Sequence, residues 1–284
     1  MTTSLLTIIQ DDRFYPSSDG KPMAENTEQY RWIVLIAENL TAIFSQNPNV
    51  FIAADLLWYP MPISERVKGE PYAQAPDIMV VWGRPKGFRS SYIQHKEENI
   101  PPQVVFEILS PSNKTEDGLR ELQKKLEFYQ RHDVEEYYTY DPMVKNLAVW
   151  HRQGSHLAPM NFSQTWVSPR LGVTFEWQPG QELFLFKPDG RPFLSFSDLD
   201  TQVEQERIRA EQERLQKEFE RQQKQEAQLQ AQQERQQAQR ERQQAQRERQ
   251  QKQEAQLQAQ QERQEKERLA AYLRSLGLDP DQLP

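Results

Sequence analysis

The sequence contains no cysteine among its 284 residues. This absence excludes disulfide bonds, cysteine-ligated zinc sites and a thiol nucleophile. No apolar stretch approaches the roughly 20 residues that a membrane-spanning helix needs. The opening segment MTTSLLTIIQDD also lacks the basic and apolar regions of a signal peptide. We therefore expect a cytoplasmic protein that does not associate with a membrane.

Glycine and proline are both missing between Pro192 and Gly277, where Gln, Glu, Arg and Ala dominate the chain. All six tryptophans precede this segment. The composition predicts a folded domain over residues 1–197, a long helix or coiled coil over 198–276, and a short tail over 277–284. The first part is long enough for one hydrophobic core of ordinary size.

Basic residues are relatively scarce in the expected domain. Residues 1–200 contain 19 Lys and Arg against 26 Asp and Glu. An acidic domain is a poor general binder of phosphate backbones, because this affinity grows with the number of basic contacts. The balance is nevertheless compatible with nucleic-acid chemistry at a metal site, where the cation offsets the local charge.

Several common catalytic patterns are also absent. There is no glycine-rich phosphate loop, and the residues around Ser110 lack the glycines of a nucleophile elbow. The four histidines do not follow the spacing of a helical metal site. A loop with Arg84, Lys86 and Arg89 interleaved with aromatic residues is either a nucleic-acid contact or an ordinary solvated loop.

The apolar spacing predicts two helices in the domain. One begins near Asn26 or Thr27 and stops by Pro48, and the other spans Glu116 to Arg131. Strands are expected at 50–59, 77–82, 104–109, 137–140, 147–151, 166–167, 173–177 and 183–186, with a loop over 83–102. This order predicts an α/β or α+β domain built on a sheet.

A single carboxylate, Glu107, interrupts the apolar strand at 104–109. A charge in such a strand is costly unless it is paired or holds a metal. Asp77 stands at the start of another apolar strand. Two carboxylates on adjacent strands make the oxygen-rich site that Mg²⁺ or Mn²⁺ prefers. Such a cation lowers the pKa of bound water and polarises a phosphoryl oxygen.

A lysine would complete this set by orienting the attacking water and offsetting charge in the transition state. The helix after the Glu107 strand has an expected inward stripe made of Leu119, Leu122, Leu126 and Tyr129. Lys125 flanks this stripe and is placed to reach over the strand ends, whereas Lys124 lies further round the helix.

At this point the chain resembles a known family. The segments APDIMVVWGRPKG, PPQVVFEILSPSN and KKLEFYQRHDVEEYYTYDP, with SPRLGV and KPDGRP further on, are similar to the bacterial Uma-two family. This family is grouped with the PD-(D/E)XK restriction-endonuclease-like superfamily. The resemblance covers about residues 10–200. It implies a central mixed sheet flanked by helices and metal-dependent hydrolysis of phosphodiester bonds.

The resemblance assigns Pro-Asp to Pro76-Asp77, the strand glutamate to Glu107 and the lysine to Lys125. The usual E-x-K motif of the superfamily would put its lysine at position 109, where this chain has Leu109. The carbonyl of Ile108 is expected to add a metal ligand. A further acidic residue is common in the superfamily, and Glu25 and Asp55 both remain candidates.

The segment after residue 198 repeats itself. KQEAQLQAQQERQ begins at Lys224 and again at Lys252, four heptads later. A period of seven residues favours a coiled coil. However, Gln and Ala fill most of the positions that would face the partner helix, and they bury little surface. A weak coiled coil with a second copy or a partner protein and a solvated single helix are both compatible with this pattern.

Three functions follow from these observations. The first is a Mg²⁺- or Mn²⁺-dependent endonuclease that acts on DNA, with Asp77, Glu107 and Lys125 as catalytic residues. The second is a catalytically inactive nuclease-like scaffold whose coiled coil binds a partner protein. The third, a nucleic-acid binder that does not cut, is disfavoured by the acidic domain.

Overall fold

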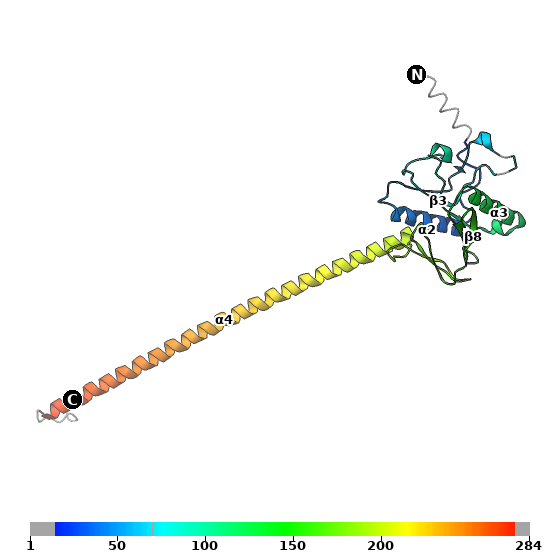
Figure 1. The fold of residues 1–284 in the computed structure, drawn as a ribbon. Helices are drawn as coiled ribbons and strands as arrows, with labels where there is room; N and C mark the ends of the chain where they lie inside the picture. Colours follow the sequence, from blue (N-terminus) through cyan, green and yellow to red (C-terminus); the bar gives the residue numbers. More distant parts are fainter. Residues whose placement is uncertain (1–14, 67, 70, 276–284) are drawn as a thin grey trace, which may run out of the picture. The chain divides into compact units, whose positions relative to one another are not determined.

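A mixed sheet forms the centre of the fold. The computed structural model describes residues 15–66, 68, 69 and 71–275. The sheet strands are β1 (Val50–Ala54), β3 (Ile78–Trp82), β5 (Val104–Ile108), β6 (Glu136–Asp141), β7 (Asn146–Gln153) and β8 (His156–Pro159). Within the described residues the sheet has six strands in the order β1-β3-β5-β6-β7-β8. Figure 1 labels β3 and β8 of this sheet. The predicted α/β class with a central mixed sheet is confirmed.

The one parallel pair described in this sheet, β5 with β6, lies at its middle. Parallel neighbours need a crossover connection, and the helix α3 (Glu116–Arg131) supplies it. The bounds of α3 agree with the sequence-based prediction. Thr115 caps the helix, since its side chain accepts a hydrogen bond from the backbone N–H of Gly118.

The two helices α2 (Thr27–Ile43) and α3 pack on opposite faces of the sheet. Ile36 of α2 belongs to the same core as Phe106 of β5. Phe128 of α3 belongs to a second core with Val105. Because successive side chains of a strand point to opposite faces, the odd-numbered residues of β5 face α3. This alternation puts Glu107 under α3.

Smaller elements complete the described residues before Phe196. A three-stranded sheet consists of β9 (Thr165–Val167), β10 (Thr174–Glu176) and β11 (Phe184–Phe186). A parallel pair consists of β2 (Trp58–Tyr59) and β4 (Tyr92–Ile93). The 3₁₀ turns are η1 (Ile63–Glu65), η2 (Gln94–Lys96) and η3 (Pro111–Lys114).

Four sequence-based predictions of local structure were wrong. The strand expected at 50–59 breaks at Asp55, whose φ of 51° is left-handed and cannot continue a strand. The loop expected at 83–102 contains β4 and η2, and β8 was not predicted. Leu119, expected on the inward stripe of α3, is 58% exposed, so the buried stripe starts later in the helix.

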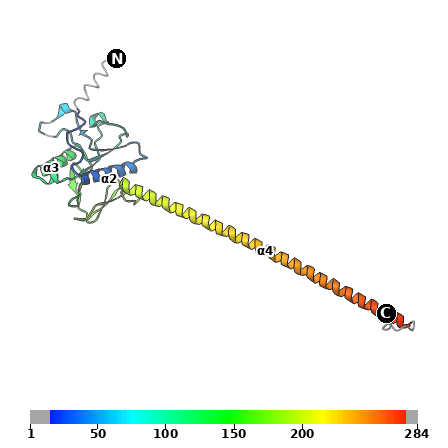
Figure 2. The same cartoon turned by 180° about the vertical axis from the view of Figure 1, so that it is seen from behind.

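The helix α4 (Phe196–Ser275) is 80 residues long and begins a few residues before the predicted start. Figures 1 and 2 draw it as one continuous helix. The chain divides into two compact units, residues 1–200 and 201–284, and the tail predicted at 277–284 lies outside the described residues. No helix in the described part combines the length and the apolar composition needed to cross a membrane.

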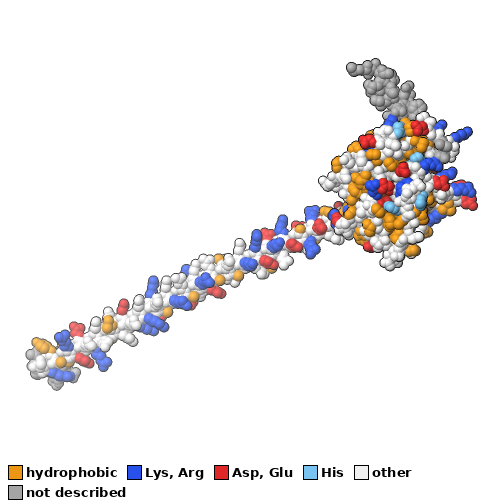
Figure 3. Space-filling model, viewed as in Figure 1, with side chains coloured by type: hydrophobic (Ala, Val, Ile, Leu, Met, Phe, Trp, Pro, Cys, Tyr) orange, Lys and Arg blue, Asp and Glu red, His pale blue; other side chains and the backbone are white. Residues whose placement is uncertain are grey.

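The surface of α4 is polar on the face seen in Figure 3, where acidic and basic side chains alternate with few apolar ones. None of its residues is buried within the described chain. Ile208, Leu215, Leu229 and Leu257 share one heptad position and are 48–57% exposed. The helix therefore leaves its few apolar side chains in solvent.

Candidate active site

The strand register aligns the predicted acids. In the antiparallel pair of β3 and β5, Ile78 lies opposite Phe106, so the next position in this register brings Asp77 opposite Glu107. Side chains opposite one another in an antiparallel pair have Cβ atoms about 4.5–5.5 Å apart. The backbone N–H of Asp55, where β1 ends, donates to the carbonyls of Pro76 (3.2 Å) and Asp77 (3.3 Å). Acids distant in the sequence thus become neighbours on one face.

Two side chains of α3 hold Glu107 from different sides. The Lys125 amine donates to Oε2 of Glu107 at 2.7 Å, and the Tyr129 hydroxyl donates to Oε1 at 2.5 Å. The side chains of Glu107 and Lys125 are only 4% and 15% exposed. The charge of Glu107 is therefore compensated inside the fold, as a buried carboxylate requires.

Asp77 is buried beside this ion pair and accepts a hydrogen bond from the backbone N–H of Ile108 at 2.6 Å. Burial and the negative charge of Glu107 raise the pKa of Asp77 well above its usual range. In the metal-free protein Asp77 consequently holds its proton more readily than an exposed aspartate. A positive charge arriving at the site would favour its ionised form.

Lys125 lies within the field of both acids. Burial alone would lower its pKa, but the charges of Glu107 and Asp77 outweigh burial and raise the pKa above the ordinary lysine value. The amine is therefore charged at neutral pH. It supplies a fixed positive charge at the point where the two carboxylates meet.

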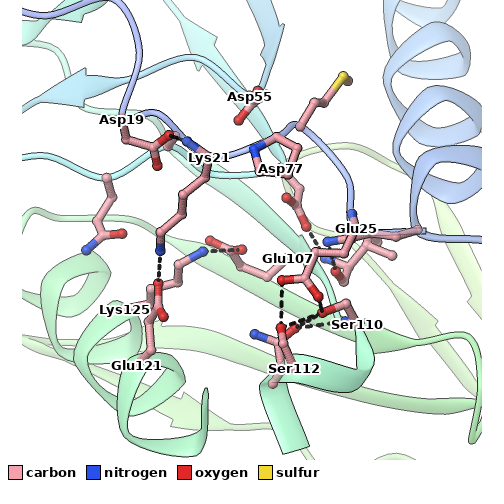
Figure 4. Close-up of a pocket in the computed structure, with 17 residues that line it drawn as sticks. Asp19, Lys21, Glu25, Asp55, Asp77, Glu107, Ser110, Ser112, Glu121 and Lys125 are labelled. Atoms are coloured by element: carbon pink, nitrogen blue, oxygen red, sulfur yellow. Dashed lines mark hydrogen bonds and ion pairs between the residues drawn. The ribbon is translucent and has the colours of Figure 1, made fainter. Parts of the chain in front are cut away.

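These groups line one cavity of about 210 Å³. Figure 4 shows the side chains around it. All the residues predicted from the sequence line this cavity, namely Asp77, Glu107, Ile108, Lys125, Glu25 and Asp55. Asp19 and Glu121 also line it, against only two lysines, Lys21 and Lys125. The cavity is thus strongly acidic, which opposes the entry of a phosphate unless cations accompany it.

Glu25 and Asp55 lie in different surroundings within the cavity. Glu25 accepts hydrogen bonds from the hydroxyls of Ser110 and Ser112, both at 2.7 Å, and these bonds lower its pKa. Burial raises the pKa of Asp55, which also interacts with the charges of Lys125 and Glu107. Asp55 is therefore the acid that is electrostatically linked to the predicted catalytic residues.

The turn η3 and the loop before α2 form the rim of the cavity. The side chain of Lys21 reaches Glu121 on α3 at 2.8 Å, as a dashed line in Figure 4 shows. Gly118 permits the close approach of α3 to η3, because a Cβ at this position would lie 2.2 Å from the carbonyl oxygen of Ser112. The rim and the helix that carries Lys125 are therefore packed directly together.

A second buried glutamate provides a contrast. Glu136 in β6 is fully buried, and it accepts hydrogen bonds from the Tyr138 hydroxyl and the Arg170 backbone N–H, both at 2.7 Å, as well as from the Ser168 hydroxyl. It does not line the cavity. A carboxylate in a strand can thus have a purely structural role. Glu107 differs from Glu136 because it lines the cavity.

The donor atoms fit a hard divalent cation that keeps part of its water shell. Within the described residues no group of three or more His, Asp or Glu side chains is arranged to hold a metal ion. Mg²⁺ is usually bound through one or two carboxylates, with waters and substrate oxygens completing the octahedron. Asp77 and Glu107 provide two carboxylates. The Ile108 carbonyl, which accepts from Gln29 Nε2 at 2.8 Å, retains a second lone pair.

Sequence reasoning missed three side chains that organise the site: Tyr129, Gln29 and Lys21. Tyr129 was assigned only to the packed stripe of α3, although its position four residues after Lys125 puts both on one helix face. Gln29 lies on α2 and Lys21 in a loop. Neither carried a pattern that pointed to the cavity.

The basic side chains of the loop with Arg84, Lys86 and Arg89 are paired within the fold. The guanidinium groups of Arg84 and Arg89 each lie within 2.8 Å of Glu97. The amine of Lys86 donates to the carbonyls of Phe44 and Ser45, both at 2.8 Å. The reading of this loop as a structural segment is favoured over a nucleic-acid contact.

Comparisons with known proteins identify a family and a similar structure. A family model, Uma2, described as "Putative restriction endonuclease", matches residues 18–180. A solved structure described as a putative nuclease belonging to DUF820, from Anabaena variabilis, is similar with a TM-score of 0.29 and 14% sequence identity, and the match covers 59% of this chain and 70% of that chain. None of the curated proteins compared with the chain is a match.

Proposed function

The chain belongs to the Uma2 family of restriction-endonuclease-type proteins, and we propose that it is a nuclease that hydrolyses phosphodiester bonds in DNA with Mg²⁺ or Mn²⁺. The observation that carries this proposal is the convergence of Asp77, Glu107 and Lys125 on one cavity, with the lysine amine 2.7 Å from Glu107. Two acids and an amine in this arrangement are suited to phosphoryl chemistry.

Each residue has a distinct role in this proposal. Asp77, Glu107 and the Ile108 carbonyl would hold the cation, which when bound supplies a water of lowered pKa and polarises the phosphoryl oxygen. Asp55 is a better candidate than Glu25 for a further acidic contact, because its charge interacts with Glu107 and Lys125.

Lys125 acts in two states. In the metal-free chain its amine neutralises Glu107 through the ion pair. With a cation held by Asp77 and Glu107, the amine would be available to hold the attacking water and to offset the charge that develops on the phosphate. Its buried stem restricts it to the cavity, so this charge is already oriented before substrate arrives.

Nicking of supercoiled plasmid DNA tests this function. We expect the full chain to nick DNA with Mg²⁺ or Mn²⁺ and not with EDTA, and Glu107→Gln to lose this activity while remaining folded. Glu127→Gln, an exposed substitution on α3, should cut like the wild type. Equal nicking by Glu107→Gln and wild type would identify a contaminant and remove the proposal. Absence of any Glu107-dependent Mn²⁺ binding would favour the inactive scaffold.

The helix α4 is proposed to bind a second copy of itself. Its apolar residues recur at multiples of seven along the chain, as a supercoiled pair requires, and an identical chain offers the same repeat in the same register. We expect the full chain to sediment with about twice its 33.6 kDa mass, with a monomer fraction that grows on dilution. Replacing both Leu229 and Leu257 by Asp should give a monomer. Replacing both Ala231 and Ala259 by Asp should not, because residues two apart on a helix do not share a face. A wild-type monomer at every concentration would instead identify a solvated single helix.

A further inference from the structure

The hydroxyl of Tyr129 contacts the carboxylate of Glu107 at the oxygen that Lys125 does not use. Tyr129 donates to Oε1 at 2.5 Å and Lys125 to Oε2 at 2.7 Å. The two residues are four apart on α3, so they lie on the same helix face. The helix therefore presents a neutral donor and a charged donor to one carboxylate.

The ring of Tyr129 is immobilised by its aromatic neighbours. Its plane is within 3° of that of Trp58, with ring centroids 6.3 Å apart, and the ring of Tyr137 lies 5.1 Å away. Tyr129 is fully buried. Such packing leaves the side chain a single rotamer, so the position of the hydroxyl is set by the core and not by solvent.

The hydroxyl has a defined role in its hydrogen bond to Glu107. A protonated phenol next to a carboxylate can only donate to it, because an ionised carboxylate has no proton to give.

From this geometry we propose that Tyr129 is a positioning residue, whose hydroxyl fixes Oε1 of Glu107 and so orients Oε2 for the cation. The inference rests on the proposed function. Rotation of a carboxylate moves both of its oxygens together, so a fixed Oε1 also fixes Oε2, the oxygen that accepts from Lys125. Groups that orient a metal ligand in this way typically change metal affinity by about 10–100-fold.

Tyr137 offers a matched control. It is a buried tyrosine on β6 whose ring contacts that of Tyr129. Among the described residues its hydroxyl has no hydrogen-bond partner. Tyr137→Phe thus removes the same atom from the same aromatic cluster without removing a hydrogen bond to Glu107.

Calorimetric titration of the full chain with MnCl₂ tests the proposal. We expect Tyr129→Phe to weaken Mn²⁺ binding by about 10-fold or more, and Tyr137→Phe to bind like the wild type. The Mn²⁺ concentration for half-maximal plasmid nicking should rise in parallel for Tyr129→Phe. A residue that only fills space would change thermal stability and leave this concentration unchanged.

The outcomes separate the two proposals. Suppose that Glu107→Gln loses Mn²⁺ binding but Tyr129→Phe binds Mn²⁺ with wild-type affinity. This result overturns the positioning role of Tyr129 and leaves the nuclease proposal intact. Equal weakening by Tyr129→Phe and Tyr137→Phe also overturns it, because disturbance of the aromatic cluster would then explain the loss. No Mn²⁺ binding by the wild type removes the proposed function itself.

Discussion

Lys125→Met should lower the free energy of unfolding by about 3–5 kcal/mol, because it leaves Glu107 buried without a counter-charge. Methionine preserves most of the apolar stem and its packing, so the loss comes chiefly from the missing charge. Nicking should be lost as well. Urea unfolding followed by tryptophan fluorescence measures the effect. All six tryptophans precede residue 178, so the signal reports the sheet domain and not α4.

Two further variants make this result specific. In Lys125→Met/Glu107→Gln the buried charge is gone and the glutamine still accepts from Tyr129, so most of the lost stability should return. Lys124→Met, exposed on the same helix, should stay within about 0.5 kcal/mol of the wild type. If Lys125→Met alone is as stable as the wild type, Glu107 and Lys125 do not form a buried pair in solution.

The residues whose roles follow from local pattern were predictable. Glu107 stands out because it interrupts an apolar strand, and Lys125 because its spacing puts it beside the packed face of α3. The bounds of α3 follow from its cap and periodicity. The structure brings both residues to the cavity as the sequence suggests, and their catalytic roles stay a prediction.

The contacts that depend on tertiary packing were not predictable. The alignment of Asp77 with Glu107 comes from the register of β3 against β5, which no single strand encodes. Gln29 reaches the Ile108 carbonyl only because α2 covers the opposite face from α3. The break at Asp55 depends on its left-handed backbone, which the strand propensity of the apolar residues on both sides of it does not indicate. Glu136 shows that burial in a strand does not by itself mark a catalytic acid.

Asp77→Asn should have opposite effects on stability and on activity. The folded-state pKa of Asp77 lies above its ordinary value, so the stability it contributes is fully present below about pH 4 and is lost as the pH rises through the raised folded value. Asparagine has no proton to lose, and its oxygen still accepts from the Ile108 N–H. At neutral pH without metal the variant should therefore unfold at higher urea than the wild type.

The gain in stability of Asp77→Asn over the wild type should depend on pH and on bound metal. Each unit by which the pKa is raised corresponds to about 1.4 kcal/mol of unfolding free energy. For a domain of this size, each kcal/mol changes Tm by about 2–4 °C. In EDTA the difference between Asp77→Asn and the wild type should be small at pH 4 and grow toward pH 8. Saturating Mn²⁺ should stabilise only the wild type, and only the wild type should nick DNA.

The pH series distinguishes this explanation from a general effect of removing negative charge. Asp117→Asn removes an exposed carboxylate from the first turn of α3. In the same urea series it should stay within about 0.5 kcal/mol of the wild type, so it measures the effect of losing one negative charge at the surface. A destabilised Asp77→Asn at pH 8 in EDTA would mean that the carboxylate is ionised and well compensated in the metal-free fold. The acidic cavity would then need no cation for its stability, and the electrostatic argument for a divalent ion at this site would be lost.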